Sequence, residues 1–128
     1  HQASCDKAAE LAPDHGAMRA IPLAVAGAFH TAIMEPAKDR LAKALEAVEI
    51  RPPRIPVTSN VDAQAHNDPD DLRSILVQQV GSPVLWNDSM NQMLAQGTEQ
   101  FVEVGTGRVL RGLMKRINRK AKCRGVND

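Results

Sequence analysis

The stretch GTEQFVEVGTGRVLRGLMKRI, residues 97–117, decides the fold class of this chain. Residues 100–104 form a short apolar run that is typical of a buried strand. The turn residues Gly105-Thr106-Gly107 follow, and a helix is then predicted because Val109, Leu113 and Ile117 recur at helical spacing. A strand that passes through a glycine turn into a helix indicates an α/β protein with a mainly parallel sheet.

Outward from this stretch, the pattern predicts four further helices and two further strands. Residues 3–12 form an Ala-rich helix that Pro13 and Gly16 end, and Asp68-Pro69 is a strong helix start. The other two helices begin near Pro36 and at Trp86, and Gly97 stops the last one. The apolar runs 20–29 and 55–61 are interpreted as buried strands.

Composition points to one soluble domain with a modest core. The chain has 128 residues, a formal net charge of +1 and only 2% aromatic residues, so aliphatic side chains and methionine must fill its interior. Cys5 and Cys123 have no metal-binding spacing and are expected to be free thiols in a cytoplasmic protein. No apolar run could cross a membrane, and we expect no metal, nucleic-acid or membrane partner. A chain that enters a helix directly after His1 favours a truncated protein.

Two places carry possible chemistry. His30 follows an apolar run, and ligands gather beyond the carboxyl ends of parallel strands. A histidine there can act as a general base, or it can serve as a capping or core residue. The turn 105–107 could cradle a phosphate at a helix N-terminus, but a tight turn that lets strand and helix pack closely is the favoured interpretation. The third glycine of a dinucleotide fingerprint would fall at Leu110.

A nucleophile is not found in this sequence. The G-x-S-x-G elbow, in which a strained turn exposes a serine, is absent around each of the serines, which are Ser4, Ser59, Ser74, Ser82 and Ser89.

Three blocks, in the same order, resemble the malonyl-CoA:acyl-carrier-protein transacylase family. They are LAVAGAFHTAIMEPA (23–37), IPVTSNVDA (55–63) with LVQQVGSPVLW (76–86), and residues 97–117. Ala26 stands where the family often has serine, and Thr106 where proline is usual. The resemblance covers the family's C-terminal portion, without the half that carries the serine nucleophile.

The resemblance implies a two-part fold. Residues 1–28 would end a small ferredoxin-like subdomain, and residues 29–128 would form the C-terminal part of an α/β-hydrolase-like acyltransferase domain with a parallel sheet.

It also implies transfer of a malonyl group from coenzyme A to the phosphopantetheine thiol of acyl-carrier protein, through an acyl-serine. His30 matches the catalytic base, Gln79 the residue whose backbone carbonyl orients it, and Phe29 the position that senses the acyl group. No cofactor is expected, because the coenzyme A thioester is the substrate.

Further expectations follow from the resemblance and from charge. The full-length protein would be a monomer of fatty-acid biosynthesis, and the fragment alone would be inactive. A non-catalytic module that binds carrier protein is the alternative. The tail is rich in cations that would steer an acidic carrier protein, and Arg111, Lys115 and Lys122 would share one face if the last helix continued.

Overall fold

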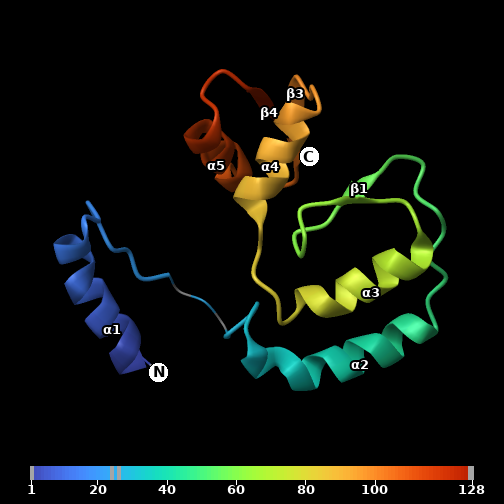
Figure 1. Ribbon diagram of the computed structural model, residues 1–128, viewed down its shortest axis with the longest axis horizontal. Coiled ribbons are helices and arrows are strands. Elements are labelled where there is room, and N and C mark those ends of the chain that lie inside the picture. The colour runs from blue at the N-terminus through green and yellow to red at the C-terminus, as the bar shows by residue number, and fades with distance from the viewer. Residues whose placement is uncertain (1, 24, 26, 127–128) are drawn as a thin grey trace.

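The structure is a computed structural model and describes residues 2–23, 25 and 27–126. In these residues, helices combine with two small sheets. Helix α1 (Gln2–Leu11) continues into the 3₁₀ turn η1 (Ala12–His15), and Gly16 ends this unit in the left-handed region at φ 84°. The helix predicted over residues 3–12 is therefore confirmed. Figure 1 shows that α1 stands apart from the other elements.

The strand predicted over 20–29 is not formed by the described residues of that run. Residues 20–23, 25 and 27–29 adopt no strand conformation, and the side chains of Ile21, Leu23 and Val25 are exposed. An apolar run becomes a strand only where a neighbouring strand pairs with it. No such neighbour exists for this run among the described strands.

Helices α2 (Glu35–Glu46) and α3 (Pro69–Gln79) lie side by side in antiparallel directions (Figure 1). The short turn η2 (Ala32–Met34) leads into α2. At the start of α3, Asp68 accepts hydrogen bonds from the backbone N–H groups of Asp70 and Asp71, which confirms the predicted cap. Arg73 of α3 donates to the carbonyls of Leu45 and Val48 and so ties the two helices together.

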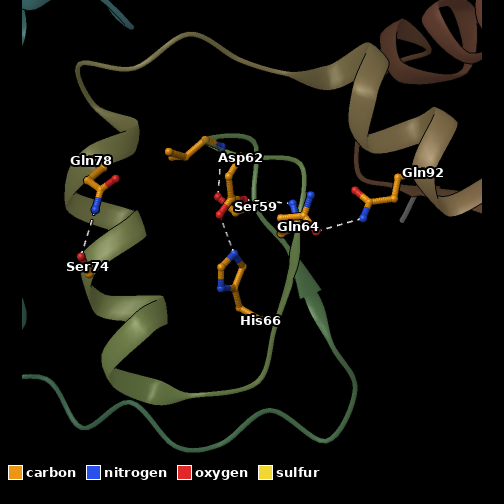
Figure 2. Close-up of polar contacts among 8 residues, drawn as sticks. Ser59, Asp62, Gln64, His66, Ser74, Gln78 and Gln92 are labelled. Atoms are coloured by element: carbon orange, nitrogen blue, oxygen red, sulfur yellow. Dashed lines mark hydrogen bonds and ion pairs between the residues drawn. The ribbon is translucent and has the colours of Figure 1, made fainter.

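The strand predicted over 55–61 is much shorter than expected. Strand β1 (Val57–Thr58) pairs antiparallel with β2 (Ala65–His66), and the turn between them is built from polar side chains. Asp62 Oδ2 lies 2.9 Å from His66 Nε2, and Gln92 Nε2 donates to Gln64 Oε1 at 3.1 Å. Figure 2 shows how these side chains lie around the turn. Because the chain turns back at once, this segment forms a hairpin and contributes no parallel strand.

The C-terminal part is a compact βαβ unit packed against α4 (Trp86–Ala95). Strand β3 (Gln100–Val104) passes into α5 (Val109–Ile117), and the chain returns as β4 (Lys122–Val126), which is parallel to β3. Met114, 1% exposed, and Met90, 6% exposed, are at the centre of this unit. The strand and helix predicted from residues 97–117 are confirmed, and so is the parallel sheet.

Strand β4 overturns the idea that the last helix continues through the basic tail. The helix ends at Ile117, and Asn118 is already extended at φ −144° and ψ 108°. Lys122 therefore lies on a strand and does not share a helical face with Arg111 and Lys115.

Candidate active site

His30 sits in a tight turn whose backbone is unusual for a residue with a side chain. Its φ is 63°, in the left-handed region that non-glycine residues seldom occupy. Thr31 Oγ1 donates to the Ala28 carbonyl at 2.7 Å across the turn, and the His30 N–H donates to the Val80 carbonyl at 3.0 Å. These contacts hold a conformation that costs free energy, a feature that clusters at functional sites.

The imidazole of His30 is oriented by the end of α3. Nδ1 lies 2.9 Å from the backbone carbonyl of Gln79, a residue 49 positions away. A carbonyl only accepts, so Nδ1 must carry the proton, and Nε2 of the neutral ring is then a free acceptor. The structure thus brings together the two residues that the resemblance pairs, with the atom expected of Gln79.

The two backbone carbonyls that His30 contacts lie at the end of one helix. The carbonyls of Gln79 and Val80 that His30 uses belong to the C-terminal end of α3, where the helix dipole leaves partial negative charge.

The Gln79 side chain also shapes this loop. Its Nε2 lies 3.3 Å from the Ser82 carbonyl and 3.4 Å from the Pro83 carbonyl, so the amide bridges the turn that follows α3. One residue thereby presents its carbonyl to His30 and closes the loop behind it.

A contact from α2 lies behind the same loop and was missed from sequence. Lys38 forms an ion pair with Glu35 at 2.6 Å, and a Cβ atom added to Gly81 would come within 2.7 Å of Lys38 Cε. The first turn of α2 therefore packs closely against the residues just beyond Gln79. The sequence signal for this ion pair was the spacing of three residues between an acidic and a basic side chain on a predicted helix.

Phe29 lies directly before the histidine and is 56% exposed. Its ring leans over Gly27, where an added Cβ atom would meet the ring edge at 3.4 Å. An apolar ring is therefore exposed beside His30, and none of the described residues buries it.

The phosphate-cradle alternative fails on geometry, because a carboxylate already occupies the N-terminus of α5. Glu103 accepts from the N–H of Leu110 at 2.9 Å and from the N–H and Nε of Arg111 at 3.3 and 3.0 Å. Burial by itself would raise the pKa of the Glu103 carboxyl. The hydrogen bonds from Leu110 and Arg111, with the charge of Arg111, outweigh burial and hold that pKa below its ordinary value.

The described residues contain neither a metal-binding cluster nor a membrane-spanning helix. No group of three or more histidine, cysteine or carboxylate side chains there could hold a metal ion. None of the described helices is long and apolar enough to span a bilayer.

Known proteins match the chain along nearly its whole length. The malonyl CoA-acyl carrier protein transacylase of Bacillus subtilis is 43% identical over 121 residues, which are 94% of this chain and 38% of the relative. The crystal structure of an acyl carrier protein S-malonyltransferase from Vibrio cholerae is 43% identical with a TM-score of 0.91, and the match covers 99% of this chain and 42% of that one.

A third match is a type II PKS acyl-carrier protein in complex with its malonyl-transacylase, at 37% identity and a TM-score of 0.87, covering 99% of this chain and 40% of that one. No family model matches the sequence. In all three matches the chain spans about two fifths of the relative's length. The matches extend over 94–99% of this chain at 37–43% identity, so the chain belongs to the malonyl CoA-acyl carrier protein transacylase family, of which it matches about two fifths of the length.

Proposed function

We propose that this chain supplies the base of an acyl-transfer site that moves a malonyl group from coenzyme A to the phosphopantetheine thiol of acyl-carrier protein. The observation that carries the proposal is the hydrogen bond from His30 Nδ1 to the Gln79 carbonyl, which leaves Nε2 free to accept a proton. The nucleophile, a serine by analogy with the family, comes from a region that this sequence does not contain.

In the first half-reaction, His30 Nε2 takes the hydroxyl proton as the serine oxygen bonds to the malonyl thioester carbon. The carbon–sulfur bond then breaks, and the departing coenzyme A thiolate takes the proton back from His30. In the second half-reaction, His30 removes the proton of the phosphopantetheine thiol, whose sulfur attacks the ester. The carbon–oxygen bond breaks, and the serine recovers the proton.

The Gln79 carbonyl replaces the carboxylate of a serine–histidine–aspartate triad in this scheme. Its task is to fix the tautomer and the direction of the ring, which a neutral acceptor can perform.

Phe29, next to the base, is proposed to contact the α-carbon of the acyl group. We further propose that residues 1–28 end a small subdomain and residues 29–128 belong to the large one. The turn at 28–31 and the separate position of α1 support this boundary (Figure 1). We also propose that the parent enzyme is a cytoplasmic monomer that serves fatty-acid biosynthesis.

The test is a chimera in which this chain replaces the matched 42% of the Vibrio cholerae enzyme. We expect the chimera to transfer malonyl groups to carrier protein, and His30→Ala to lower kcat by about 10²–10⁴-fold. His15→Ala, at an exposed position in η1, is the matched control and should leave kcat unchanged. A folded His30→Ala chimera with an unchanged rate would refute the proposed role.

A further inference from the structure

The loop that carries the hydrogen-bond acceptors of His30, residues 79–83, is held a second time by the first turn of α2. The carbonyls of Gln79 and Val80 accept from the Nδ1 and the backbone N–H of His30. Gly81 follows directly, and a Cβ atom added there would lie 2.7 Å from Lys38 Cε and 3.0 Å from Lys38 Nζ. The lysine side chain therefore occupies the space that a side chain at position 81 would need.

Lys38 is far less exposed than the lysine of a comparable ion pair in this chain. Its side chain is 23% exposed, whereas the side chain of Lys7, which pairs with Glu10 at the same three-residue spacing, is 66% exposed. Lysine is seldom buried, and a lysine whose stem packs on other residues contributes through packing as well as through charge. The pair of Lys38 with Glu35 is therefore unlike a solvated surface pair, which contributes little.

Glu35 fixes the end of this lysine. Glu35 Oε1 accepts from Lys38 Nζ at 2.6 Å, and the same oxygen would lie 3.4 Å from a Cβ atom on Gly81. Glu35 is the first residue of α2, where the helix dipole stabilises a carboxylate. Both side chains of the ion pair thus lie against Gly81, and the pair restricts where the lysine can move.

The base and this contact belong to one continuous segment of the chain. Residues 30–38 run from the His30 turn through η2 into the first turn of α2. The loop 79–83 meets this segment at two points, through the hydrogen bonds of His30 and through the packing of Lys38 on Gly81. A loop attached at a single point can rotate about that point, whereas a second attachment fixes its direction.

We propose that Lys38 is a positioning residue for His30, because it holds the loop 79–83 against α2 and keeps the Gln79 carbonyl directed at Nδ1. The inference rests on the proposed function, since a fixed tautomer matters for catalysis only if His30 is the base. It adds a residue that acts through the loop and not on the substrate.

The imidazole ¹⁵N shifts of the 128-residue chain test this role without catalysis. Long-range ¹H–¹⁵N spectra at alkaline pH, where the rings are neutral, distinguish a protonated from an unprotonated ring nitrogen, and His30→Gln assigns the His30 signals. Wild type should show one His30 tautomer, with the proton on Nδ1. Lys38→Ala should move these shifts towards those of His15, an exposed histidine whose neutral ring samples both tautomers. Lys43→Ala, at an exposed position of α2, is the matched control and should leave the His30 shifts unchanged.

A second variant displaces the lysine without removing it. The φ of Gly81 lies outside the left-handed region, so Gly81→Ala is compatible with the backbone, and the flexible end of Lys38 has to move away from the added methyl group. We expect the same change in the His30 shifts as with Lys38→Ala. The double variant Lys38→Ala/Gly81→Ala should show no further change, because both substitutions remove one and the same contact.

The kinetic test uses the chimera. Lys38→Ala should lower kcat at least about fivefold, within the roughly 10²-fold that a misplaced catalytic group can cost, and should leave KM for malonyl-CoA nearly unchanged. Lys43→Ala should leave both constants unchanged.

Three results would overturn the role of Lys38. They are unchanged His30 shifts in Lys38→Ala, an effect of Gly81→Ala that is equally large when Lys38 is already alanine, and a kinetic loss confined to KM. The last result would make Lys38 a substrate contact. A failure of the proposed function is distinguishable, because it appears as an unchanged rate in the His30→Ala chimera, whereas the ¹⁵N shifts report the orientation of the ring whatever its role in catalysis.

Discussion

At the scale of single residues, Phe29 is where the choice of acyl group can be tested. Its exposed ring directly precedes His30, and if it contacts the α-carbon of the acyl group as proposed, an extra methyl group there would meet it. In the chimera, Phe29→Ser should narrow the preference for malonyl over methylmalonyl, since one methyl group in a tight pocket is worth about 1–3 kcal/mol. The measurement is the ratio of kcat/KM for the two thioesters. An unchanged ratio would show that Phe29 does not contact the α-carbon.

Glu103 provides a residue-scale prediction about pH. Its pKa is lower in the folded chain than in the unfolded chain, so ionisation of Glu103 contributes stability above the unfolded pKa. That contribution is lost as pH falls through the lower, folded value. Glu103→Gln should therefore destabilise the chain near neutral pH and flatten the acid limb of its stability curve.

Urea unfolding of wild type and Glu103→Gln between neutral and strongly acidic pH measures this effect. Glu99→Gln, at an exposed position just before β3, is the matched control and should follow the wild-type curve. Parallel curves for wild type and Glu103→Gln would contradict the prediction.

At the scale of elements, the basic end of α5 is the surface that we propose the carrier protein contacts. Lys115, Arg116 and Arg119 line one depression at the end of this helix, whereas Arg111 is held by Glu103 and Lys122 lies on β4. Replacing the three with glutamine in the chimera should lower kcat/KM for the acidic carrier protein several-fold and leave malonyl-CoA kinetics nearly unchanged.

Salt provides the control for this prediction. The loss should shrink between low and moderate ionic strength, because a steering field is screened over about 10 Å at 0.1 M. A loss that is equal for both substrates, or that does not depend on salt, would mean that these cations stabilise the C-terminal end of the helix and do not attract the carrier protein.

The elements also show which parts of the fold are readable from sequence. Helices were predicted well because their signals are local, as when Asp68 and Pro69 mark the start of α3. Strands were predicted poorly because a strand is defined by a distant partner. Strand β4 carries a lysine and an arginine and no apolar run, yet it pairs along the whole of β3, while the apolar run 20–29 pairs with nothing described.

In the candidate site, too, local features could be predicted from the sequence and long-range contacts could not. Apolar context singled out His30, but only the resemblance to a family paired it with Gln79, because no local pattern links residues 49 positions apart. The capping of α5 by Glu103 was missed for the same reason, since the carboxylate reaches across the glycine turn from the strand before it.

At the scale of the whole molecule, the 128-residue chain by itself should not form an acyl-enzyme. His30, the proposed base, is oriented by Gln79, but the sequence has no serine in a nucleophile elbow. Incubation with radiolabelled malonyl-CoA followed by denaturation should leave the chain unlabelled, while the chimera treated in the same way retains label. Stoichiometric label on the isolated chain would show that one of its own residues serves as nucleophile.

The hydrogen bond between His30 and Gln79 has a consequence for the order of folding. It closes a loop of 49 residues, whereas α2 and α3 are stabilised by contacts within single turns. Helical segments form within about a microsecond. Closing a long loop costs chain entropy before the distant contact is made, so that contact forms later. A newly made chain therefore carries an unoriented imidazole until α3 docks beside α2, and gains a directed base only at the end of that process.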